Sequence, residues 1–119
     1  MKEGAIYSSQ GEHCLVPRVF RASRWWDRAR GLLGLPPLNQ GEGLLISPCS
    51  SIHTIGMRYP IDVVFLNAAW TVVKIVERFP AARFCGARLA RLTLELPAGE
   101  VDRMGIVVGE RLIWREGAA

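Results

Sequence analysis

Pro60-Ile61-Asp62-Val63-Val64-Phe65-Leu66 is the most apolar strand-like stretch of this 119-residue chain, and the turn residues Asn67-Ala68-Ala69 follow it. Proline at position 60 favours an extended conformation at Tyr59, so a strand is expected to begin at Ile61. Its β-branched and aromatic residues are those that strands prefer. A second strand is expected over residues 70–76, and the two strands would form a hairpin.

The rest of the chain also favours short strands. They are expected over residues 13–21, 43–47 and 92–96, and residues 106–108 and 111–114 are expected to form one or two more. Pro17 would place the first of these at a sheet edge, and Thr93 and Glu95 would give the 92–96 strand one solvent-facing side. Residues 48–60 read as a connection.

Helical patterns are fewer. Ser23 can cap an amphipathic helix in which Trp25 or Trp26, Ala29, and Leu32 or Leu33 share one face. Glu100 to Met104 is expected to form a short helical turn ending at Gly105. We therefore expect a β-rich α+β fold: a small curled or closed, mostly antiparallel, barrel-like sheet with one main side helix.

Length and composition indicate one soluble domain over residues 1–119, with residues 1–11 as a poorly ordered or edge segment. Half of the residues are hydrophobic and 22% are charged, as in ordinary globular proteins. The apolar stretch 61–73 is too short and too polar to span a membrane. No apolar run follows the N-terminal Lys2, so we do not expect a secretory signal. We therefore expect a cytoplasmic location.

Cys14, Cys49 and Cys85 are odd in number and widely spaced, which predicts free thiols rather than disulfides. A basic cluster spans Arg18 to Arg30, with Trp25 and Trp26 inside it. Arginine and aromatic residues together can bind nucleic acid, but an ordinary surface helix explains the same pattern and no nucleic-acid motif accompanies it. Nucleic-acid binding is therefore an alternative that we do not expect.

Eight motifs spread along the chain form a distinctive series: residues 30–33, 41–46, 48–49, 52–54, 56–58, 60–66, 94–99 and 105–112. Together they resemble the domain of unknown function 192 family, and the 60–66 string is the most specific. The resemblance implies a compact bacterial or archaeal domain with no established activity. Two positions depart from the family pattern: Asn67 stands where an acid is common, and Glu110 where aspartate is usual.

Asp62 is the most conspicuous polar residue, because apolar neighbours occupy both faces of its strand. A carboxylate there needs a charged partner or hydrogen bonds. We expect Asp62 to pair with Arg58 or His53, or to accept N–H groups from the connection that precedes it. Its role would be structural, pinning that connection, or ligand-facing.

Cys49, His53 and Met57 have the residue types and spacing of a blue-copper loop, with His13 as the remaining histidine. Zinc could use His13, Cys49 and His53, one ligand short of a structural site. Cys49 and His53 with Asp62 could also form a nucleophilic set for acyl or thiol chemistry. No complete catalytic signature or cofactor motif accompanies any of these sets.

The interpretation that we favour is a ligand-binding or accessory domain with a pocket between the 48–60 connection and the start of the next strand. His53, Met57, Arg58 and Asp62 would line this pocket, and the ligand would be small and polar or anionic. We expect no cofactor. An enzyme that uses Cys49, His53 and Asp62 is the alternative, and the sequence leaves the oligomeric state open.

Overall fold

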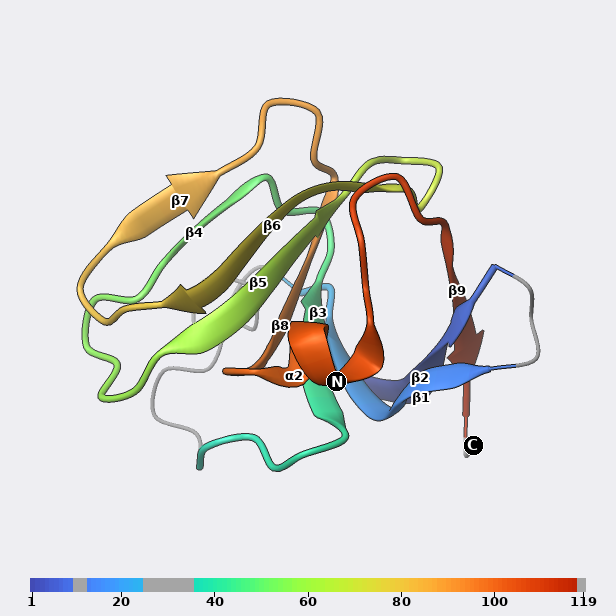
Figure 1. Cartoon of the computed structure of the whole chain (residues 1–119), viewed down its shortest axis with the longest axis horizontal. Helices are drawn as coiled ribbons and strands as arrows, with labels where there is room; N and C mark the ends of the chain where they lie inside the picture. The colour runs from blue at the N-terminus through green and yellow to red at the C-terminus, as the bar shows by residue number, and fades with distance from the viewer. Residues whose placement is uncertain (10–12, 25–35, 118–119) are drawn as a thin grey trace.

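A computed structural model describes residues 1–9, 13–24 and 36–117 of the chain. Nine strands and one short helix lie in these ranges (Figure 1). The larger sheet contains β1 (Lys2–Ser8), β2 (Cys14–Ala22), β3 (Glu42–Ile46), β5 (Ile61–Leu66), β6 (Val72–Phe79), β8 (Leu92–Pro97) and β9 (Leu112–Glu116). A small sheet pairs β4 (Ser51–His53) with β7 (Phe84–Gly86), and the helix is α2 (Glu100–Met104).

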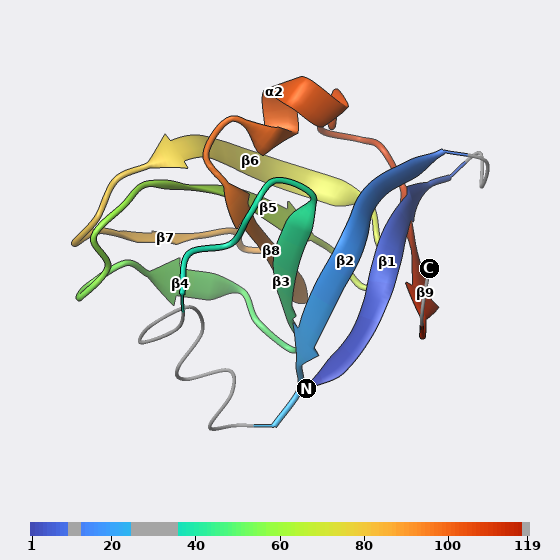
Figure 2. The same cartoon turned by 90° about the horizontal axis from the view of Figure 1, so that it is seen from below.

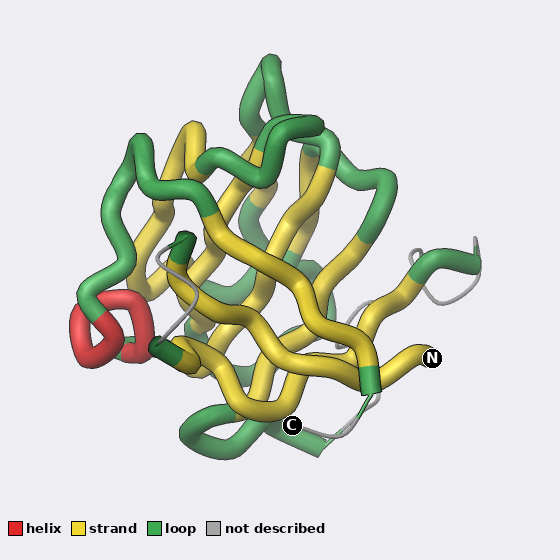
Figure 3. The backbone as a smooth tube through the Cα atoms, turned by 90° about the vertical axis from the view of Figure 1, so that its right-hand side faces the viewer, coloured by secondary structure: helices red, strands yellow, loops and turns green. Residues whose placement is uncertain are grey.

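The seven strands of the larger sheet follow the order β6-β5-β8-β3-β2-β1-β9. Within the described chain, β2 and β3 form the one parallel pair, so the sheet is mixed but mostly antiparallel. The sheet is curled into a half-barrel (Figure 3), and a bridge between Thr71 and Arg111 brings its two edge strands together. The β-rich, curled sheet that the sequence predicts is confirmed.

Strand β5 is buried along its whole length because each face of the sheet packs against a separate hydrophobic cluster. Val64 and Leu66 belong to one cluster, which also includes Val101 of α2. Val63 and Phe65 belong to the other. The β4–β7 sheet lies beside β5 and β6, away from β1 and β9 (Figures 1 and 2), and contributes Ile52 to the second cluster.

The structure corrects the sequence prediction at the N-terminal part of the chain. Strand β1 pairs with β2 on one side and β9 on the other, so it is an internal strand rather than a poorly ordered or edge segment. Strand β2 is also internal, and Pro17 lies where the pairing of β1 with β2 shifts register. A shift of this kind tolerates a residue without an N–H group, which explains a proline inside the sheet.

Two further predictions were wrong. The 48–60 connection contains the short strand β4, and β8 has no solvent-facing side, because Thr93 and Glu95 are both buried. Of the one or two short strands expected over residues 106–108 and 111–114, one forms, as β9, and residues 106–108 are not part of it. The amphipathic helix predicted around Trp25 and Trp26 lies outside the described residues. Among the described residues, no helix is long and apolar enough to cross a membrane.

Candidate functional site

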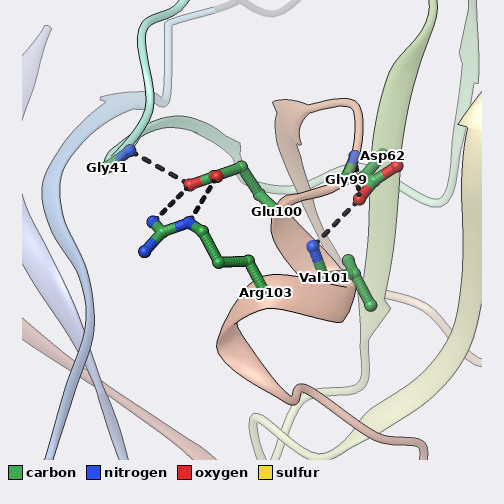
Figure 4. A network of polar contacts seen from close by, with 6 residues as sticks. All are labelled: Gly41, Asp62, Gly99, Glu100, Val101 and Arg103. Atoms are coloured by element: carbon green, nitrogen blue, oxygen red, sulfur yellow. Dashed lines mark hydrogen bonds and ion pairs between the residues drawn. The ribbon is translucent and has the colours of Figure 1, made fainter.

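The carboxylate of Asp62 is fully buried and accepts three main-chain hydrogen bonds. Figure 4 shows its position beside two of the donors, Gly99 and Val101. Oδ1 accepts the N–H of Arg78 at 2.8 Å. Oδ2 accepts the N–H groups of Gly99 at 3.0 Å and Val101 at 2.9 Å. Both oxygens are therefore occupied by protein donors, which offsets the cost of burying the charge.

These bonds explain how α2 begins. Gly99 is the N-cap residue and has no side chain that could accept an N–H group. Asp62 supplies the missing acceptor from another strand, and its negative charge lies at the positive end of the helix dipole. On the other side of Asp62, Arg78 has a positive φ of 50° where the β5–β6 pairing shifts register, and its N–H donates to Asp62 there.

The prediction named the correct type of partner for Asp62, backbone N–H groups, but placed these donors in the wrong segment of the chain. Asp62 does accept backbone N–H groups, but the donors follow it in the chain instead of preceding it. His53 and Arg58 are exposed, and the ring of His53 lies 6.0 Å from that of Phe84. Asp62 therefore holds β5, β6 and α2 together, and the structure does not direct it toward the 48–60 connection.

Glu100 is a second buried acid, and it is paired. Its oxygens accept hydrogen bonds from Nε and Nη2 of Arg103, both at 2.8 Å, and from the N–H of Gly41 at 3.0 Å (Figure 4). The bond from Arg103 is the main cause that holds the pKa of Glu100 below its usual value. Glu100 thus joins α2 to the turn before β3.

Glu95 on β8 is buried without such partners. It is 3% exposed, and within the described chain no hydrogen bond satisfies its carboxyl group. Burial raises its pKa to about 7. Sequence reasoning placed Glu95 on a solvent-facing side because it alternates with leucines, and missed that the β4–β7 sheet and its neighbours cover that face.

Tyr59 and Cys85 are the ionisable neighbours of Glu95. Burial, and then the charge of Glu95, raise the pKa of Tyr59, whose buried hydroxyl has no partner in the described structure. Burial raises the pKa of the Cys85 thiol to about 11, although Lys74 opposes the shift. Cys85 is therefore protonated near neutral pH and is not an activated nucleophile.

The proposed nucleophilic set of Cys49, His53 and Asp62 is not assembled by any described contact. Asp62 has its three main-chain donors, and the thiol of Cys49 donates to the carbonyl oxygen of Ser51 at 3.1 Å. Cys14, Cys49 and Cys85 are all free, as predicted. Among the described residues, no three histidine, cysteine or acidic side chains, His13, Cys49 and His53 included, gather where they could hold a metal ion.

The basic cluster from Arg18 to Arg30 is only partly described. Arg18 forms ion pairs with Glu3 at 3.1 Å and with Glu42 at 3.6 Å. Arg21 lies against two tryptophan rings. Arg28 and Arg30 lie outside the described residues, so the nucleic-acid alternative stays a prediction.

The first residues of the 48–60 connection line an open cavity of about 380 Å³, here called the loop cavity. Its lining residues are Pro48, Cys49, Ser50, Arg88, Ala90 and Arg91. A smaller, apolar cavity of about 230 Å³ lies at the other end of the connection, beside Tyr59 and Pro60. The residues that the sequence predicted to line a pocket, His53, Met57, Arg58 and Asp62, are not among the lining residues of the loop cavity, and the two arginines that follow β7 were not predicted.

Residues 6–114 match the model of the family of domain of unknown function 192, described as uncharacterized ACR. The chain belongs to this family. A UPF0127 protein of Pyrococcus furiosus is 35% identical over 65 residues, which are 55% of this chain and 56% of that protein. A UPF0127 protein of Thermococcus sibiricus is 29% identical over 102 residues, 82% of this chain and 66% of the relative. The chain thus spans less than two thirds of either relative.

Two solved structures share the fold. A protein of unknown function from Novosphingobium aromaticivorans has a TM-score of 0.78 at 21% identity, covering 94% of this chain and 84% of that one. A protein from Sinorhizobium meliloti has a TM-score of 0.79 at 23% identity, covering 95% and 92%. At these identities the likeness concerns the fold alone.

Replacing Asp62 by Asn tests the structural role of this carboxylate. The amide has one acceptor oxygen and would direct an NH₂ group at a main-chain donor, so we expect a loss of about 3 kcal/mol in the free energy of unfolding. Urea unfolding measures it. Asp102→Asn removes an exposed carboxylate of the same helix and is the control, and equal stability of the two variants would contradict the role.

Replacing Glu95 by Gln tests the raised pKa. With a pKa near 7 when folded and near 4.5 when unfolded, protonated Glu95 contributes stability that is complete below about pH 4.5 and is lost as pH rises through 7. The loss amounts to about 3 kcal/mol. The stability of Glu95→Gln relative to the native chain should therefore rise between pH 5 and pH 8.

Urea unfolding at several pH values measures this change. Glu77→Gln, at an exposed position of β6, is the matched control and should follow the pH profile of the native chain. Parallel profiles for Glu95→Gln and the native chain would show that Glu95 ionises normally in the folded state.

Proposed function

We propose that this domain binds a small anionic ligand of the size of phosphate or a carboxylate in the loop cavity. The observation that carries the proposal is the position of Arg88 and Arg91, two exposed guanidinium groups on one wall of that cavity. Neither guanidinium has a hydrogen-bond or ion-pair partner in the described structure, and no acidic residue lines the cavity. The local charge therefore favours an anion.

The walls of the loop cavity are joined by main-chain hydrogen bonds. The N–H of Cys49 donates to the carbonyl of Arg91 at 2.8 Å, and the N–H of Ala87 donates to the carbonyl of Ser50 at 3.0 Å. The hydroxyl of Thr93 donates to the carbonyl of Cys49 at 3.2 Å. A backbone that is already ordered loses little entropy when a ligand binds, which favours affinity in a small open site.

The donors suit the proposed ligand. Guanidinium groups form paired hydrogen bonds to phosphate and carboxylate oxygens, and the hydroxyl of Ser50 offers a further donor. His53, Met57 and Arg58 lie further along the same connection, and their contact with a ligand stays a prediction. The free thiols are consistent with a reducing compartment, and a cytoplasmic location also stays a prediction.

Titration with inorganic phosphate, followed through the NMR signals of the Ser50 and Ala90 amides, tests the loop cavity. The double variant Arg88→Gln/Arg91→Gln should bind phosphate at least about tenfold more weakly, because it loses two charged donors. Salt should weaken binding to the native chain, since the site is open to solvent.

Arg83→Gln is the matched control, because Arg83 is an exposed arginine outside the cavity lining with no predicted role in binding. It should keep the affinity of the native chain. Loss of binding in Arg58→Gln but not in the double variant would move the site to Arg58 and overturn the proposal, as would the absence of any shift at Ser50 and Ala90.

A further inference from the structure

A second open cavity, of about 400 Å³, lies where the curled sheet meets its own edge and is here called the seam cavity. The turn between β5 and β6 approaches the start of β9 at this place, through the bridge between Thr71 and Arg111 (Figure 1). The lining residues are Arg21, Trp70, Arg111, Leu112, Ile113 and Trp114. None of them lines the loop cavity.

Arg21 lies against both indole rings of the seam cavity. Its guanidinium carbon is 5.6 Å from the ring centroid of Trp70 and 5.6 Å from that of Trp114. Within the described structure its one hydrogen bond runs from Nη2 to the hydroxyl of Ser47, at 3.4 Å. Most of the five N–H donors of this guanidinium are thus not used by protein acceptors there.

Local structure fixes the two indoles. Trp70 has a positive φ of 65°, which is uncommon for an aromatic residue, and hydrogen bonds hold it there: its N–H donates to Asn67 and its carbonyl accepts from Leu112, both at 2.9 Å. The ring of Trp114 lies over Gly4, where an added Cβ would come within 2.7 Å of two ring atoms. The missing side chain at Gly4 leaves room for this ring.

The charge of the seam cavity is positive. Arg111 is exposed, has no side-chain partner in the described structure, and shares the cavity with Arg21 and no acidic residue. Half-exposed tryptophans offer stacking surfaces for a flat ring, and arginines bind an anionic group beside it. If Arg21 only covered the hydrophobic cluster against which Trp70 and Trp114 pack, that role would explain the position of Arg21. It would not explain why Arg111 lines the same cavity.

We infer that the seam cavity binds a small planar aromatic anion, with the ring stacked on Trp70 or Trp114 and the anionic group paired with Arg21 and Arg111. This site is separate from the one under the proposed function, because the two cavities share no lining residue. Either inference can fail while the other stands.

The test uses 2-naphthoate as probe and the indole N–H signals of Trp70 and Trp114 in NMR spectra as readout. Naphthoate should shift both signals in a saturable way. Acetate, which lacks the ring, and naphthalene-2-carboxamide, which lacks the charge, should each bind at least about tenfold more weakly.

Arg111→Gln should weaken naphthoate binding about tenfold, and it changes an exposed side chain that the fold does not need. Arg83→Gln, at an exposed arginine that lines neither cavity, is the control and should bind naphthoate as the native chain does. Unmoved indole signals, or equal affinity in Arg111→Gln and the native chain, would overturn the inference and leave Arg21 as a cap of the hydrophobic cluster.

Discussion

The buried carboxylate of Asp62 is the constraint on which the arrangement of β5, β6 and α2 depends. It is the acceptor for three main-chain N–H groups that come from two other segments of the chain. Without it, the first turn of α2 would begin at a glycine with no capping side chain, and buried donors would be left unpaired. One side chain thus joins segments 16 to 39 residues apart in the sequence.

Among the described residues, the buried acids Asp62, Glu95 and Glu100 differ in their hydrogen-bond partners. The difference separates two acids with a structural role from one whose role is not explained by the fold. Asp62 and Glu100 both have hydrogen-bond donors for their oxygens, and the bond from Arg103 lowers the pKa of Glu100. Glu95 has none in the described structure, and its pKa is raised. A buried acid that titrates near neutral pH, beside Tyr59 and Cys85, is a feature that the fold alone does not require.

The amino-acid pattern predicted those features of the structure that depend on residues close together in the sequence. The apolar run at β5, the turn at Asn67 and the family motifs were all visible in the sequence. The partners of Asp62, the burial of Glu95 and the position of Arg88 opposite Ser50 depend on segments that pair over long distances. Alternation along a strand says which residues share a face, but not what covers that face, so Glu95 was placed in water.

Hydrogen exchange of the backbone amides of Arg78, Gly99 and Val101, measured by NMR under native conditions, tests the central claim most directly. If Asp62 holds these groups as described, all three should exchange only as slowly as global unfolding allows, although Gly99 and Arg78 lie at a turn and at an irregular strand position. Exchange of Gly99 and Val101 as fast as that of exposed loop amides would show that Asp62 does not organise the fold.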